Sequence, residues 1–158
     1  MIAPTEQCPW RRRVLCGEVH DDNCFAMGGV AGHAGLFATA ADVDTLANML
    51  HACYRGEDDF VPPALLRQFW TRDGRVSGST WALGWDTPSP TGYSSAGARM
   101  SRDAVGHLGF TGTSIWIDPS RHAHVILLTN RVHPTRTNDQ IRDVRPRVHD
   151  AALEALDG

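Results

Sequence analysis

The region of residues 106–130 constrains the fold of this 158-residue chain more than any other, because it contains three short segments with strand character, the first of them around residues 105–107. Residues 113–118 alternate β-branched and aromatic side chains with others, and residues 125–129 form an apolar run. Residues 118–121, which lie between them, have the composition of a hairpin turn. An apolar strand needs cover on both faces, so the sequence predicts an antiparallel hairpin at the centre of a sheet.

Helix signals occur on both sides of this hairpin. Thr39 is a suitable N-cap for a helix whose apolar residues follow helical spacing, and Gly56 is expected to end it. The proline pair at 62–63 opens a second, shorter helix. A last helix is expected to begin near Pro146, and a short strand is expected at residues 81–85.

These elements predict a single, incomplete α+β domain over residues 1–158. Its parts are a loop-rich segment (1–38), a helical segment (39–72), antiparallel strands (80–130) and a C-terminal helix (146–157). A long segment without periodicity inside a compact domain indicates either a functional loop or a missing part of the domain.

The composition has one unusual feature, which is that all 15 basic residues are arginines. This excludes every mechanism that requires a lysine from this chain. The net charge of −3 gives no support to nucleic-acid binding. We expect the arginine-rich stretch 131–147 to be a solvated, salt-bridged surface.

No apolar run has the length of a transmembrane helix, and the N-terminus does not resemble a signal peptide. We therefore expect no contact with a membrane and, if the chain is expressed as it stands, a cytoplasmic location. The four cysteines have no Cys-x-x-Cys spacing and are expected to be reduced thiols. No cofactor is expected.

Two segments carry a resemblance to a known family. One is Gly35-Leu-Phe-Ala-Thr-Ala-Ala-Asp42, at the start of the first expected helix, and the other is Gly106-His-Leu-Gly109, just before the hairpin. Together they are similar, over about residues 28–157, to the class C-like branch of the serine β-lactamase and penicillin-binding-protein superfamily. The resemblance implies the C-terminal portion of the β-lactamase/transpeptidase-like fold, in which a C-terminal helix packs on the sheet.

The family uses a Ser-x-x-Lys nucleophile, a Tyr-x-Asn motif and a Lys/His-Thr-Gly strand to attack the carbonyl of a lactam, a D-Ala peptide or an ester. Only the third motif can be carried over to this chain. His107 takes the Lys/His position, Gly109 allows close approach of the backbone, and Phe110 would supply an oxyanion N–H. Leu108 replaces the usual threonine, which removes a hydroxyl that could hydrogen-bond a substrate.

The other two motifs are absent. Ser-x-x-Lys cannot occur without lysine, and Tyr93-Ser-Ser95 ends in serine and follows the first helix instead of preceding it. Because the family places both motifs upstream, the resemblance implies the C-terminal part of a serine hydrolase that is inactive alone. Its implied partners are the missing N-terminal half and a small-molecule or peptide substrate. The family is often periplasmic or secreted, so the location of a parent protein stays open.

The alternative to an incomplete enzyme is a non-catalytic binding or interaction module that keeps the family fold. In either case the N-terminal strands that the family pairs with residues 125–129 are missing from this chain. The apolar edge of that strand should then be unpaired and open to self-association.

Other residues are weaker candidates for a functional site, because each also has a simpler structural role. His33 could line the catalytic cleft, although a hydrogen bond to loop backbone is the simpler role. Ser114 with His107 could be a nucleophile and base, but a serine on a strand is usually structural. His122 and His124 could begin a metal site, but no third ligand is evident, and we expect no metal.

Overall fold

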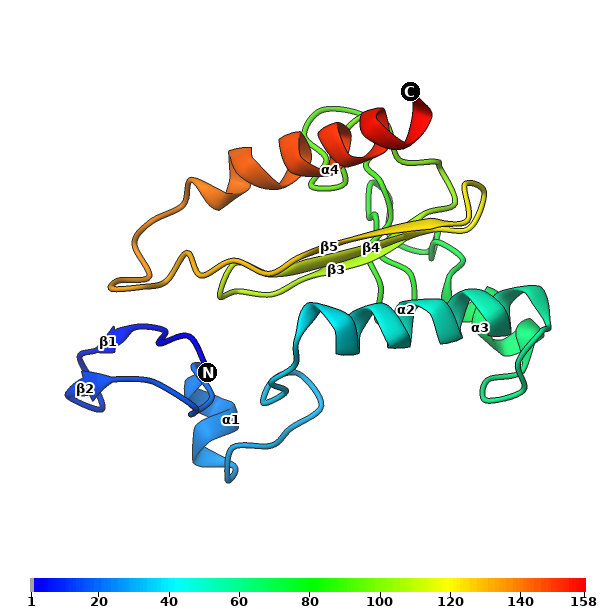
Figure 1. Cartoon of the computed structure of the whole chain (residues 1–158). Coiled ribbons are helices and arrows are strands. Elements are labelled where there is room, and N and C mark those ends of the chain that lie inside the picture. Colours follow the sequence, from blue (N-terminus) through cyan, green and yellow to red (C-terminus); the bar gives the residue numbers. More distant parts are fainter. Residues whose placement is uncertain (1) are drawn as a thin grey trace.

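The segments around the predicted hairpin form the main sheet of the computed structural model, which describes residues 2–158 (Figure 1). β3 (Val105–Leu108), β4 (Ser114–Asp118) and β5 (Ala123–Leu127) are antiparallel in the order β3-β4-β5. β4 is central, as expected, but β5 is an edge strand with partly exposed side chains. The central position predicted for the whole hairpin is therefore wrong for β5. The unpaired outer edge is confirmed, because no other strand of the described residues pairs with it.

Helices cover both faces of this sheet (Figure 1). α2 (Ala40–Arg55) and α3 (Pro63–Phe69) lie on one face, and α4 (Ile141–Asp157) lies on the other. Side chains of β4 alternate between the two layers. Ile117 packs in the core between the sheet and helices α2 and α3, and Trp116 packs in the core between the sheet and α4. This arrangement confirms the predicted α+β class with a C-terminal helix on the sheet.

The boundaries of α2 follow from its end residues. The Thr39 hydroxyl accepts a hydrogen bond from the Asp42 N–H (3.2 Å), and the Asp42 carboxylate accepts one from the Thr39 N–H (2.8 Å). This reciprocal pair satisfies two N–H groups that a helix start leaves free. Gly56 ends the helix with a φ of 82°, a left-handed conformation that favours glycine. Both predicted ends of the helix are confirmed.

α4 begins at Ile141 instead of near Pro146, so the predicted start of this helix is wrong. A proline inside a helix lacks the N–H that would bond the carbonyl four residues earlier. Here that carbonyl belongs to Arg142, and it accepts a hydrogen bond from the Tyr93 hydroxyl at 2.8 Å. A side chain from a distant loop thus satisfies the group that the proline leaves unpaired.

The N-terminal segment, predicted to be loop-rich, contains three short elements. β1 (Gln7–Cys8) and β2 (Arg13–Val14) pair as an antiparallel hairpin, and α1 (Asp22–Ala26) follows them. The carboxylate of Asp21 caps α1 by accepting the Cys24 N–H at 2.7 Å. This segment lies at one end of the main sheet (Figure 1).

Residues 81–85 form a tight turn and not the predicted strand. Trp81 and Asp86 make an isolated bridge, and Gly84 between them has a φ of 77°. The left-handed glycine reverses the chain before a strand can extend. Among the helices of residues 2–158, none is long and apolar enough to cross a membrane.

Candidate active site

The end of β3 presents the residues of the candidate motif. Gly106 lies opposite Trp116 of β4, and a Cβ atom at this glycine would be 2.3 Å from the Trp116 ring. His107 is the next residue, and its side chain is exposed with its ring 5.9 Å from that of Trp81. Leu108 is half-buried. The strand therefore offers one imidazole to solvent and packs its other side against the core.

Within residues 2–158, the turn after β3 leaves the backbone N–H groups of Phe110 and Thr111 without a hydrogen bond. The Gly109 N–H donates to the Thr113 carbonyl (2.8 Å), and the Gly112 N–H donates to the Gly109 carbonyl (3.1 Å). In residues 2–158, no acceptor lies within hydrogen-bond distance of the Phe110 N–H. The residue itself is exposed (58%).

The absence of a side chain at Gly109 leaves room for a residue of the same turn. A Cβ atom at this position would lie 2.1 Å from the Thr113 hydroxyl oxygen, inside the same turn. The close approach that the glycine allows in this chain is thus to Thr113. The expected approach to a substrate stays a prediction.

Two arginines from other parts of the chain hold the carbonyl groups of this turn. Arg145 of α4 donates from Nη2 to the carbonyls of Gly109 (2.6 Å) and Thr113 (2.8 Å). Arg131 donates from Nε to the Phe110 carbonyl (2.8 Å), and its guanidinium lies 4.2 Å from the centre of the Phe110 ring. These charge-assisted bonds bring two positive charges to the turn.

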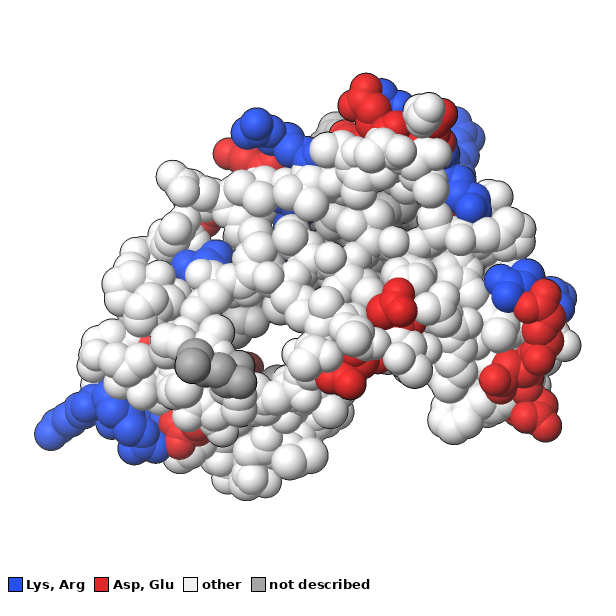
Figure 2. All heavy atoms as spheres, viewed as in Figure 1, with Lys and Arg blue, Asp and Glu red and all other residues white. Residues whose placement is uncertain are grey.

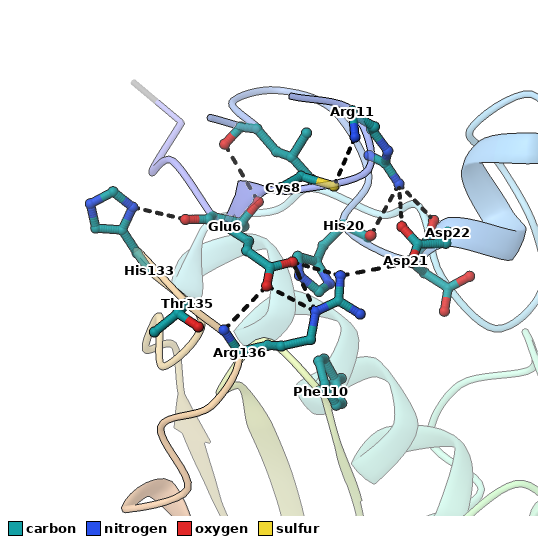
Figure 3. Close-up of polar contacts among 12 residues, drawn as sticks. Glu6, Cys8, Arg11, His20, Asp21, Asp22, Phe110, His133, Thr135 and Arg136 are labelled. Carbon is teal, nitrogen blue, oxygen red and sulfur yellow. Dashed lines mark hydrogen bonds and ion pairs between the residues drawn. The ribbon is translucent and has the colours of Figure 1, made fainter. Parts of the chain in front are cut away.

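The Phe110 ring also stacks on His20, with ring centres 5.6 Å apart. His20 is buried, and its Nε2 lies 3.1 Å from the carboxylate of Glu6. Arg136 donates from Nε and Nη2 to the same carboxylate at 2.6–2.9 Å. Figure 3 shows these groups joining the N-terminal segment, the loop after β5 and Phe110.

The ion pair with Arg136 sets the protonation of Glu6. Hydrogen bonds from the guanidinium, joined by one from His20, outweigh the effect of burial and lower the pKa of Glu6 to about 2. Glu6 is 3% exposed. The carboxylate therefore stays charged under ordinary conditions and holds the support of Phe110 together.

Sequence reasoning missed this support. The arginine-rich stretch was expected to be a solvated surface, but Arg131 and Arg145 bond carbonyls of the candidate site and Arg136 bonds a buried carboxylate. That expectation is wrong for Arg145, which is buried, whereas Arg136 is partly exposed and salt-bridged as expected. Glu6 had no local signal, because it lies 130 residues from its arginine partner.

The remaining candidates lie elsewhere. His33 is exposed, and its Nε2 lies 3.0 Å from the carboxylate of Asp21, the cap of α1. No hydrogen bond of the described residues joins His33 to residues 107–110. His124 lies 2.8 Å from the carboxylate of Asp44. Within the described residues, no group of three or more metal-ligating side chains is close enough to hold an ion.

Ser114 pairs with His149 and not with His107. The Nδ1–H of His149 donates to the Ser95 carbonyl (2.8 Å), so its Nε2 accepts the Ser114 hydroxyl proton (3.0 Å). His149 is fully buried and Ser114 is 4% exposed. A buried serine cannot reach a substrate carbonyl, so this pair is part of the core.

Replacing His107 with alanine is expected to change the free energy of unfolding by less than about 1 kcal/mol, because the ring is exposed. His149→Ala provides the comparison. It removes a buried ring with two hydrogen-bond partners and should cost roughly 2–5 kcal/mol. Urea denaturation of both variants measures the difference. Equal losses would contradict the surface position of His107.

Comparisons with known proteins bear on the family and the fold of this chain. Residues 3–148 match the family model described as Beta-lactamase. A putative D-alanyl-D-alanine carboxypeptidase of Escherichia coli K12 is 35% identical over 130 residues, covering 78% of this chain and 29% of that protein. A protein of Salmonella agona with the same description is 34% identical over 134 residues, covering 83% and 31%.

A crystal structure of a β-lactamase from Mycobacterium bovis superposes with a TM-score of 0.65 at 22% identity, covering 84% of this chain and 53% of that one. This likeness shows the fold. The chain thus belongs to the β-lactamase family of serine β-lactamases and penicillin-binding proteins, and it spans less than a third of the length of its curated relatives.

Proposed function

We propose that this chain forms the oxyanion side of a serine hydrolase active site that cleaves an amide, lactam or ester through an acyl-enzyme. The observation that carries the proposal is the free Phe110 N–H, in a turn held by Arg145, Arg131 and His20. A rigid, unpartnered donor suits a carbonyl oxygen that gains negative charge in the transition state. His107 is exposed at the end of the same strand and would help to orient the substrate.

The first substrate class to test is a peptide that ends in D-alanine, since two relatives are described as putative D-alanyl-D-alanine carboxypeptidases. Such a peptide carries a terminal carboxylate. The exposed imidazole of His107 and the positive charge of Arg131 beside Phe110 favour an anionic substrate. Leu108 offers no hydroxyl to this carboxylate, which leaves the other two groups to recognise it.

The nucleophile must come from a segment outside this chain, because Ser-x-x-Lys requires a lysine that the sequence lacks. In the complete site, the serine oxygen bonds to the carbonyl carbon and its proton passes to the leaving group as the C–N or C–O bond breaks. Water then attacks the acyl-enzyme and releases the acid. Phe110 and the N–H of the nucleophile bind the oxyanion in both steps.

Exposed apolar residues support the proposal that another polypeptide segment packs against this chain. Leu36 is 97% exposed and Phe37 48% exposed, just before α2, and the outer edge of β5 is unpaired in the described residues. Figure 2 shows an opening between the N-terminal segment and the start of α2, bordered mostly by uncharged residues. Exposed apolar side chains of this size indicate a contact surface. The proposed occupant is the N-terminal half of a family member, and without it the chain would self-associate.

The isolated chain is expected to show no saturable hydrolysis of a chromogenic ester or lactam and no labelling by a fluorophosphonate probe. The same assays are run after mixing with a family polypeptide that carries Ser-x-x-Lys and Tyr-x-Asn and ends before the segment equivalent to residues 3–148. Size-exclusion chromatography measures assembly. We expect the self-associated chain to give way to a mixed complex that hydrolyses the ester and takes up one probe.

Two outcomes would contradict this function. Stoichiometric labelling of one serine in the isolated chain, with turnover lost when that serine is replaced, would mean that the chain has its own nucleophile. A mixed complex in which the added serine stays unreactive would favour the non-catalytic module. Phe110→Pro removes the N–H together with the ring that contacts His20 and Arg131, so Phe110→Ala, which removes the ring and keeps the N–H, is its control in the complex.

A further inference from the structure

The Phe110 N–H and the Gly109 carbonyl belong to one peptide unit, which is planar. The two groups point in opposite directions, so a bond that fixes the carbonyl also fixes the N–H. Arg145 makes one such bond, with its Nη2 2.6 Å from the Gly109 oxygen, and the Gly112 N–H makes a second, longer one at 3.1 Å. Arg145 of α4 thus lies behind the Phe110 N–H, the donor proposed for the oxyanion, and helps to fix its direction.

The surroundings of Arg145 are unusual for a charged side chain. It is 8% exposed, and it makes no ion pair with a carboxylate of the described residues. Its Nη2 bonds the carbonyls of Gly109 and Thr113, and its buried Nε has no hydrogen-bond partner. Burial lowers the pKa of this guanidinium. A buried cation without a counter-ion is costly, so a purely structural role would be served as well by a neutral side chain.

We propose that Arg145 is a positioning residue that aims the Phe110 N–H and strengthens it as a donor to the oxyanion. A positive charge on the carbonyl oxygen draws electron density from the same peptide, which makes its N–H more polar. The charge lies behind the peptide, on the side away from the substrate, from where it would attract negative charge that develops on the oxygen bound by the N–H. The inference rests on the function proposed above, but its main test does not.

Arg131 provides an internal reference. Its Nε donates to the Phe110 carbonyl. This carbonyl and the Thr111 N–H form the next peptide unit along the chain. The two arginines therefore act on two consecutive peptides. Removing the charge of Arg145 should alter the Phe110 amide first, and removing the charge of Arg131 should alter the Thr111 amide first.

The test records the backbone amide resonances of the ¹⁵N-labelled chain. In Arg145→Gln the Phe110 amide proton should move upfield more than any other amide of residues 107–113, and it should exchange with solvent more slowly. Arg145→Lys keeps the charge with a different shape and should give a smaller shift in the same direction. Arg147→Gln, an exposed change on the same helix, should leave Phe110 unchanged.

A lower melting temperature without a selective change at Phe110 would overturn the proposal and leave Arg145 as a structural residue. If Arg145→Gln fails to fold, Arg145→Lys decides alone, and an unchanged Phe110 amide in that variant has the same meaning. In the mixed complex, Arg145→Gln should lower kcat about 10-fold or more with little change in KM. An inactive complex of the unaltered chain would refute the proposed function, whereas the resonance data would still decide the role of Arg145.

Discussion

Replacing Gly106 with valine is expected to destabilise the fold by about 3 kcal/mol or more, which could prevent folding. A Cβ atom at this position would lie 2.3 Å from the Trp116 ring and 2.6 Å from the Ile115 carbonyl oxygen. Trp116 is fully buried beneath α4, so its ring cannot move away without opening the core. Valine is otherwise favourable in strands, so a loss of folding stability in this variant would come from the clash with Trp116.

The measurement is the urea midpoint of Gly106→Val beside that of Gly74→Val. A Cβ atom at Gly74 would meet no atom within 4 Å, so this change should be nearly neutral. Shrinking the neighbour in the double variant Gly106→Ala/Trp116→Leu should cost less than the sum of the two single changes, because the two side chains share one space. A Gly106→Val variant as stable as the parent would contradict the packing of β3 on β4.

Acid is expected to remove about 2 kcal/mol of stability through Glu6 alone. Its pKa is lowered from 4.5 to about 2 in the folded chain, so the stabilisation is fully present above about pH 4.5 and is lost as pH falls towards 2. The magnitude is reduced from the full value because Arg136 is partly exposed to solvent. Urea denaturation at a series of pH values measures it.

Glu6→Gln should lower stability at pH 7 and flatten the pH dependence between 4.5 and 2. Glu154→Gln is the control, since Glu154 makes an exposed pair with Arg99 and its loss should cost less than about 0.5 kcal/mol. The same acid dependence in Glu6→Gln as in the parent would show that another group titrates. The change should also loosen Phe110, because His20 depends on the Glu6 carboxylate.

Local sequence patterns predicted the elements whose ends are set by neighbouring residues. Thr39 and Gly56 predicted both ends of α2, because caps act over three or four residues. Pro146 gave the wrong start for α4, because the hydroxyl that bonds the freed carbonyl belongs to Tyr93, far away in sequence. Gly84 turned an expected strand into a turn through its left-handed backbone.

The residues of the candidate site also fall into those that local sequence predicts and those set by distant contacts. The motif predicted that His107 and Phe110 lie at the end of a strand, because residues 106–110 are contiguous in the chain. The groups that hold Phe110 come from α4, from the loop after β5 and from the N-terminal segment. Arg145 and Glu6 could not be assigned from sequence, because nothing in their neighbourhood shows which distant carbonyl or guanidinium they meet.

The central claim is that Phe110 donates its N–H to the oxyanion of a serine hydrolase. It is tested most directly in the mixed complex, with this chain ¹⁵N-labelled and the serine of the added polypeptide bound to a phosphonate, whose oxygen stands in for the oxyanion. We expect a large downfield shift of the Phe110 amide proton when the phosphonate bonds to the serine, and a smaller shift in Arg145→Gln. A labelled serine with an unchanged Phe110 amide would contradict it.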